Sequence, residues 1–172
     1  MQTLERSKEI AGYRVRYQEL PAFDLTGFTK IVASGGELYD EVRADGKWEV
    51  LRTLGGDDMT IYGVASFDKE CTKDHYRYTL AVKSPLAERL AEADRHGSLF
   101  KLHILESEWL VVELEHFMRQ YGVFWQADPY ALVQKLGWSF NSRVGLHIDM
   151  YGPSYSSDDD AMEFMMPVKR SA

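Results

Sequence analysis

Extended and helical patterns follow one another in the same order in both halves of the chain, and this repeat is the strongest constraint on its fold. In the first half, strands are predicted at residues 13–18, 23–32, 61–67 and 75–82, around a helical stretch at 35–54. In the second half, strands are predicted at 99–105, 108–115, 144–151 and 162–169, around a helical region that includes 128–137. Equivalent patterns are about 85 residues apart.

The repeat predicts one α+β domain built from two strand-helix-strand-strand units related by a pseudo-twofold axis. The first repeat covers about residues 13–84 and the second about 99–170, with a polar stretch between them in which only a short helical turn is expected (85–97). Such repeats are expected to form an antiparallel sheet with helices on one face and a ligand cleft on the other.

Local signals mark where the helices begin and end. Gly46 is expected to kink or split the first helical stretch, which ends at the glycine pair 55–56. In the second half, Asp128 is placed as the N-cap, Pro129 as the first helical residue and Gly137 as the stop.

Composition excludes several classes of function. The 172 residues carry a formal net charge of −7, and an acidic chain without a basic cluster is a poor match for the phosphates of nucleic acid. The single cysteine, Cys71, rules out an internal disulfide, and no stretch approaches the ~20 apolar residues of a membrane span. We therefore expect a cytoplasmic protein that does not bind DNA directly and has no membrane partner.

The segment GLHIDMYGP (145–153) points to a binding site. In an extended strand, Leu146, Ile148 and Met150 face one way, and an imidazole, a carboxylate and a phenol face the other (His147, Asp149 and Tyr151). If the apolar set faces the helices, these polar side chains share the opposite face with Trp109, which alternates with an apolar set of its own. A concave site of aromatic and acidic groups suits a flat, apolar cation.

Motifs in both halves carry a resemblance to a known family. They are YRVRYQELPAFDLTGF at the start, WEVL in the first helix, IYGVASFD and YRYTLAV as paired strands, SEWLVVE and IDMYGP in the second half, and MEFMMPVK at the end. In this order and spacing the chain resembles the GyrI-like small-molecule-binding domain over about residues 13–170. That domain is also the effector-binding domain of AraC-type and some MerR-type multidrug-responsive transcription regulators.

The resemblance implies two strand-helix-strand-strand (SHS2) repeats and a cleft that binds varied amphipathic compounds, often cations. By position, the acid that meets the positive charge is Asp149, its neighbouring tyrosine is Tyr151, and the aromatic residue near the start of its strand is Trp109. Asp stands where the family usually has Glu, so the carboxylate is one methylene shorter. The residues before Tyr13 are too few for a helix-turn-helix, so a DNA-binding domain is expected to be absent, fused outside this chain or separate.

The predicted ligand-binding residues are thus Asp149, Tyr151, Trp109 and His147. No catalytic residue, metal site or cofactor is predicted, because HxxxH, CxxCH and G-x-S-x-G spacings are missing from the sequence. The leading interpretation is a binding module that senses or sequesters a small amphipathic cation. Two alternatives stay open: a hydrolase of strained electrophiles such as cyclopropane-containing alkylators, and an inhibitor of a protein partner such as gyrase.

Overall fold

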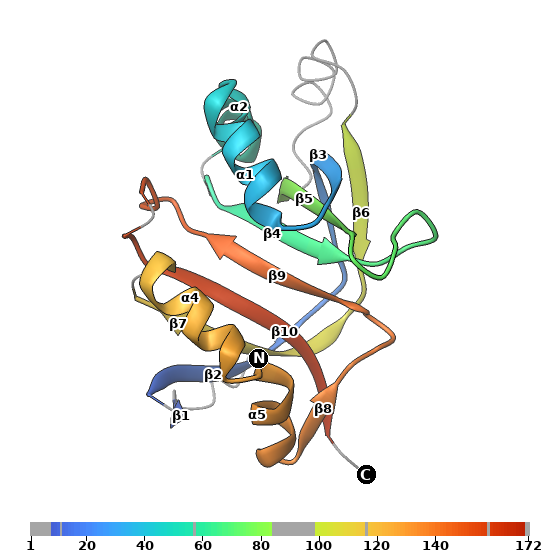
Figure 1. The fold of residues 1–172 in the computed structure, drawn as a ribbon, viewed down its shortest axis with the longest axis vertical. Helices are drawn as coiled ribbons and strands as arrows, with labels where there is room; N and C mark the ends of the chain where they lie inside the picture. The colour runs from blue at the N-terminus through green and yellow to red at the C-terminus, as the bar shows by residue number, and fades with distance from the viewer. Residues whose placement is uncertain are drawn as a thin grey trace. The chain divides into compact units, whose positions relative to one another are not determined.

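The computed structural model describes residues 8–10, 12–56, 58–83, 99–115, 117–157 and 159–170. Its strands are β1 (Lys8–Ile10), β2 (Tyr13–Leu20), β3 (Phe23–Val32), β4 (Ile61–Ser66), β5 (Tyr76–Lys83), β6 (Phe100–Ile104), β7 (Ser107–Leu114), β8 (Trp138–Phe140), β9 (Leu146–Tyr151) and β10 (Met162–Arg170) (Figure 1). Its helices are α1 (Gly35–Ala44), α2 (Lys47–Gly55), α4 (Phe117–Gln126) and α5 (Pro129–Lys135). This is the expected α+β class with antiparallel strand pairing, and that prediction is confirmed.

The chain divides into two compact units, which we describe separately. Unit 1 comprises residues 1–22, 105–149 and 154–172, and unit 2 comprises residues 23–104 and 150–153. Strand β9 starts in unit 1, and its last two residues are assigned to unit 2.

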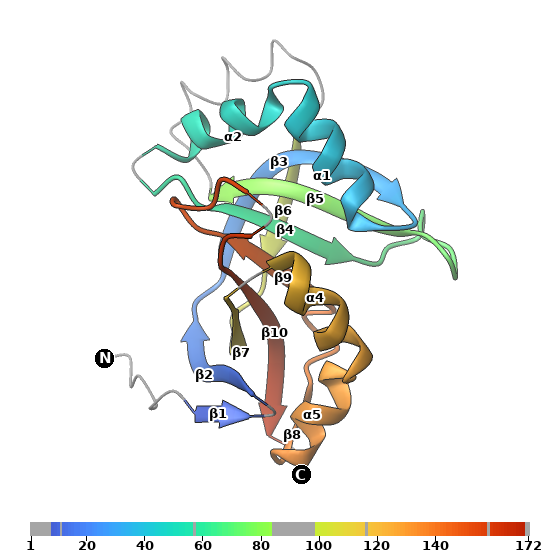
Figure 2. The same ribbon diagram turned by 60° about the vertical axis from the view of Figure 1, so that its left-hand side comes forward.

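Unit 2 is an antiparallel sheet in the order β4-β5-β3-β6, with two helices packed on it. Helix α1 contacts β3 and β5, and helix α2 contacts β4 and β5 (Figure 2). The buried apolar side chains of this unit include Leu38, Val42, Leu51 and Leu54 from the helices and Leu25, Phe28, Val64 and Leu80 from the strands. Burial of these apolar surfaces is the main force that holds helices and sheet together.

Two glycines in unit 2 are required by geometry. Gly27 lies where β3 passes close to β5, and a Cβ built on it would lie 2.0 Å from the carbonyl oxygen of Leu80. Gly46 has φ +80°, a left-handed conformation that glycine adopts without steric cost, and it separates α1 from α2. The expected split of the first helical stretch at Gly46 is therefore confirmed.

Unit 1 is an antiparallel sheet in the order β1-β2-β7-β10-β9, with the short strand β8 paired to β10. Helix α4 packs on one face of this sheet, where Phe124 and Trp125 contact Phe164 of β10. Helix α5 begins as expected, with the Asp128 carboxylate accepting a hydrogen bond from the backbone N–H of Ala131 at 3.3 Å.

The units take one strand each from the other half of the sequence. Strand β2 precedes β3 in the chain, yet it pairs with β7 in unit 1 from Arg14 opposite Glu113 to Leu20 opposite Ser107. Strand β6 precedes β7, yet it pairs with β3 in unit 2. Each unit therefore contains a strand-helix-strand-strand core from its own half of the chain and a lead strand from the other half.

Some features of the chain were not expected, and others fall outside the described part. Strands β1 and β8, each three residues long, were not predicted. The short helical turn expected in residues 85–97 lies outside the described residues. Within the described ranges, no helix has both the length and the apolar character needed to cross a lipid bilayer.

Candidate functional site

Asp149 is a buried carboxylate held by a tyrosine from a helix. The residue is 2% exposed and lies in β9. The hydroxyl of Tyr121 in α4 donates to this carboxylate, with distances of 3.3 Å to Oδ1 and 3.2 Å to Oδ2. A carboxylate taken out of water is costly unless hydrogen-bond donors compensate it, and the α4 hydroxyl supplies one such donor.

His147 lies two residues before Asp149 and contacts the same helix. Its ring centroid is 5.2 Å from that of Trp125 in α4 and 5.2 Å from that of Phe164 in β10. Although part of the residue remains exposed, desolvation by burial lowers the pKa of His147 to about 4. At pH 7 the ring is neutral, and it adds no positive charge beside the acid.

The predicted arrangement of the two sheet faces is wrong for β9. Phe164, which contacts α4, stands opposite Val112 of β7, so Leu110, Val112 and Leu114 face the helix as expected. His147 and Asp149, however, also contact α4, and by strand alternation Leu146, Ile148 and Met150 point to the other face. The prediction assumed that apolar strand residues must face the helix. Here α4 presents a phenol and an indole, and polar strand residues pack against them.

Trp109 and Asp149 point to opposite faces of the unit 1 sheet. It precedes Leu110 in β7 and so points to the sheet face opposite α4, between its cross-strand neighbours Gln18 and Pro167. Its side chain is 0% exposed, and within the described part of the chain its indole Nε1 meets no hydrogen-bond partner. The expectation that Trp109 shares a face with Asp149 is therefore wrong.

Tyr151 belongs to an aromatic cluster in unit 2. It is 2% exposed, and its ring centroid lies 5.7 Å from that of Tyr39 and 5.6 Å from that of Trp48. Its hydroxyl lies 3.4 Å from the hydroxyl of Tyr78. Gly63 makes room for this pair, because a Cβ built there would lie 2.1 Å from the Tyr78 hydroxyl and 3.2 Å from the Tyr151 ring.

Sequence reasoning missed four of these side chains: Tyr121, Trp125, Tyr39 and Trp48. Helical spacing could have indicated the first two, because residues 121, 124 and 125 lie on one face of a helix and all three are aromatic. Helical spacing could not identify the strand that these residues contact, because that requires knowing which face of β9 is turned toward the helix. Tyr39 and Trp48 lie on two different helices, and their approach depends on the turn at Gly46.

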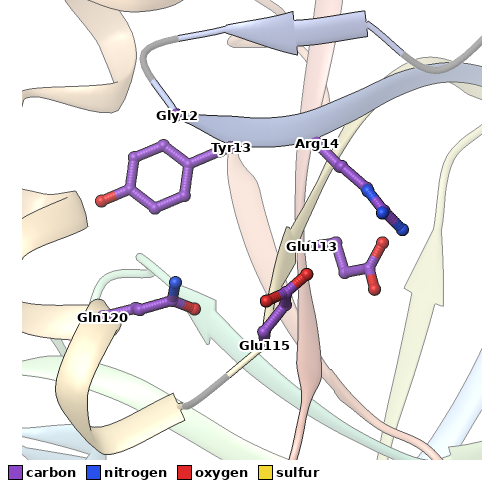
Figure 3. Close-up of a pocket in the computed structure, with 6 residues that line it drawn as sticks. All are labelled: Gly12, Tyr13, Arg14, Glu113, Glu115 and Gln120. Atoms are coloured by element: carbon purple, nitrogen blue, oxygen red, sulfur yellow. The ribbon is translucent and has the colours of Figure 1, made fainter.

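A separate polar pocket of about 180 Å³ lies at the β2 end of the unit 1 sheet (Figure 3). It is lined by Gly12, Tyr13, Arg14, Glu113, Glu115 and Gln120. In Figure 3 the side chains of Arg14 and Glu113, which are cross-strand neighbours, point toward one another. None of the predicted ligand-binding residues lines this pocket, and apart from the ring of Tyr13 its lining side chains are polar or charged.

The part of the chain that the structure describes contains no candidate metal site. Three or more His, Cys, Asp or Glu side chains do not come together there in a group that could hold a metal ion. The expectation that the protein works without a metal or cofactor remains a prediction.

Comparison with solved structures finds the same fold in proteins of very different sequence. The chain is similar to SAV2435, solved with bound tetraphenylphosphonium, at a TM-score of 0.69 and 15% identity over 91% of this chain and 93% of that one. It is similar to EcmrR in a complex with DNA (TM-score 0.61, 14% identity, 95% of this chain and 60% of EcmrR), and to a hydrolase from Listeria innocua (TM-score 0.53, 13% identity, 90% and 91%).

No protein-family profile matches the sequence, and no curated protein matches it. At these identities the structural likeness establishes the fold alone. The fold that the resemblance implied is confirmed at that level.

Proposed function

We propose that this chain is an effector-binding domain that binds a small amphipathic cation at Asp149. The observation that carries the proposal is the buried Asp149 carboxylate, which accepts from Tyr121 and lies two residues from His147 on a strand covered by an aromatic helix. A carboxylate in aromatic surroundings attracts a cation whose charge is spread over apolar groups. SAV2435, which has this fold, was solved with a ligand of that kind.

In this proposal Asp149 meets the ligand's positive charge, and the hydroxyl of Tyr121 orients the carboxylate. Trp125 and the neutral ring of His147 give flat contact surfaces in unit 1, and the predicted role of Tyr151, which belongs to unit 2, stays a prediction. Trp109 is left out, because it points to the other face of the unit 1 sheet. The ligand is not limited to one compound in this proposal, because stacking and charge pairing select a class rather than a shape.

We also propose that the domain works in the cytoplasm as part of transcription regulation. EcmrR, solved in a complex with DNA, has this fold over 60% of its length, so a protein that contacts DNA can carry such a domain beside other parts. With a net charge of −7, this chain is expected to leave DNA contacts to a fused or separate domain.

The test is a titration with tetraphenylphosphonium, followed by calorimetry, on the wild type and on Asp149→Asn. Asn keeps the shape of Asp and removes its charge. Removing one partner of a desolvated charge pair typically costs a few kcal/mol, so we expect the variant to bind this cation about ten- to a hundredfold more weakly. Neutral triphenylphosphine oxide is the control ligand, and its affinity should change less than about threefold.

Two results would contradict the proposal. Equal weakening of the cation and of the neutral oxide would assign Asp149 a structural role. Hydrolysis of a strained alkylating substrate would favour the hydrolase alternative, if the product exceeds the protein many-fold and Asp149→Asn abolishes this turnover.

A further inference from the structure

The polar pocket of unit 1 brings charged side chains of both signs to one cavity (Figure 3). Arg14 comes from β2, Glu113 from β7, and Glu115 from the chain just after β7. The ring of Tyr13 and the side chain of Gln120 in α4 complete the lining of this cavity of about 180 Å³. All of these residues belong to unit 1, and we call their cavity the β2–β7 pocket.

Two arginines of β2 differ in how their charge is used. Arg16 forms a two-bond pair with Glu163 of β10, at 3.1 Å and 2.7 Å. Arg14 lies opposite Glu113 in the pairing of β2 with β7, and the two side chains point toward one another (Figure 3). Among the side chains that the structure describes, however, no ion pair includes Arg14, Glu113 or Glu115. These three charged groups are therefore available to a molecule in the pocket.

The chemistry of the lining selects a ligand that carries both signs of charge. A guanidinium group presents paired N–H donors that match a carboxylate, and a carboxylate accepts hydrogen bonds from an ammonium group. A ligand with positive charges alone would place one of them beside Arg14, and a purely anionic ligand would meet Glu113 and Glu115. One cationic and two anionic side chains match one carboxylate and two ammonium groups, which are the charged groups of lysine.

We propose that the β2–β7 pocket binds a free basic amino acid, with its α-carboxylate at Arg14 and its two cationic groups at Glu113 and Glu115. This site lies apart from the residues of the cation site at Asp149 and does not depend on that site. Arg14 and Glu115 are exposed, and exposed ion pairs are individually weak. We therefore expect weak binding, with saturation at millimolar concentrations of the amino acid.

L-Lysine is the probe, and two relatives each lack one of its charged groups: cadaverine has no carboxylate, and norleucine has no side-chain ammonium. In NMR titrations of the intact chain, each relative should bind about two- to fivefold more weakly than lysine, the size expected for one exposed ion pair. Arg14→Gln should weaken lysine by the same factor without weakening cadaverine. Glu115→Gln should weaken both lysine and cadaverine. The backbone amide resonance of Gly12, which lines the pocket, should shift as lysine is added.

Matched controls remove the same kinds of charge elsewhere in unit 1. Arg143→Gln and Glu19→Gln each remove an exposed charge outside the pocket lining and should change the affinity for lysine less than about 1.5-fold. Glu9→Gln tests the other strand beside Arg14, because the backbone of Glu9 in β1 lies opposite Arg14. This variant should also retain the affinity for lysine, since Glu9 is not among the residues that line the pocket.

Four results would each overturn the proposed amino-acid site. They are absence of saturable lysine binding, binding of cadaverine or norleucine as tight as that of lysine, equal weakening of lysine by Arg14→Gln and Arg143→Gln, and a loss in Glu9→Gln as large as in Glu115→Gln. Asp149→Asn separates the two proposals. It should weaken tetraphenylphosphonium and leave lysine binding unchanged, so failure of one site is distinguishable from failure of the other.

Discussion

His147 makes the stability of the protein depend on pH. Desolvation against Trp125 and Phe164 lowers its folded-state pKa from 6.5 to about 4. As pH falls through 6.5, the unfolded chain takes up a proton at this residue, and the folded chain does so only near pH 4. Protonation therefore favours the unfolded state across this window, and stability that is present above pH 6.5 is lost as pH decreases.

As pH is lowered from 7 to 4, we expect the protonation of His147 to reduce the free energy of unfolding by roughly 2 to 3 kcal/mol. His147→Gln removes the titrating group, so the difference between wild type and variant isolates it from the carboxylates that titrate in the same range. The measurement is urea denaturation at a series of pH values. Curves for the two proteins that stay parallel from pH 7 to pH 4 would show that the folded His147 titrates normally.

At the residue scale, the sequence identified the strand that carries the acid but not its surroundings. Alternation placed His147, Asp149 and Tyr151 on one side of a strand, because a strand exposes every second residue to the same face. Which face meets the helix is a tertiary property. β9 has buried residues on both faces, so hydrophobic alternation could not decide the question, and Tyr121 could not be assigned to Asp149.

At the element scale, local sequence signals predicted the bounds of the longer strands and the ends of the helices closely. The predicted second strand, 23–32, coincides with β3, and Gly46, Asp128 and Pro129 mark helix ends as expected. The three-residue strands β1 and β8 were missed, because such a length gives too little alternation to distinguish a strand from a loop. Long periodic elements are therefore readable from this sequence, and short pairing segments are not.

Strand β4 provides a test of close packing through its glycine. Gly63→Ala would place a methyl group 2.1 Å from the Tyr78 hydroxyl, so Tyr78 and Tyr151 must shift. We expect a loss of about 1 to 3 kcal/mol in unfolding free energy, typical of overpacking in a core. Chemical denaturation followed by circular dichroism measures it.

Gly122→Ala is the matched control for this substitution. Gly122 is exposed in α4 with nothing within 4 Å of a built Cβ, so alanine should stabilise the helix by about 0.5 to 1 kcal/mol. A Gly63→Ala protein as stable as the wild type would mean that the tyrosine pair is not tightly packed against β4.

At the scale of the whole molecule, the order of elements along the chain differs from their grouping in space. Sequence periodicity predicted repeats at about 13–84 and 99–170. The compact units differ from these ranges by the exchange of β2 and β6 and by residues 150–153, at and after the end of β9, which belong to unit 2. Periodicity reports which segments are alike, and pairing between distant strands leaves no comparable signal in one sequence. The exchange means that neither half of the chain holds all the strands of a unit.

Fragments test this exchange. A fragment of residues 1–84 contains β2 without its partner β7, and β3 without β6. A fragment of residues 99–172 contains β7 without β2. Each would expose apolar surface that is buried in the intact chain, such as Leu110 and Val112 beside the missing β2. We therefore expect neither fragment to unfold cooperatively on heating, as followed by far-ultraviolet circular dichroism.

An equimolar mixture of the two fragments should regain a cooperative transition, because each supplies the strand that the other lacks. The intact chain serves as the reference, and amide hydrogen exchange should show protection of β2 in the mixture and not in fragment 1–84 alone. The two fragments are separate molecules, and their association costs entropy that the intact chain does not lose. The temperature of the cooperative transition should therefore rise with the concentration of the fragments. A cooperative transition in fragment 1–84 alone, with β2 protected, would show that the first repeat folds by itself and that the exchange is dispensable.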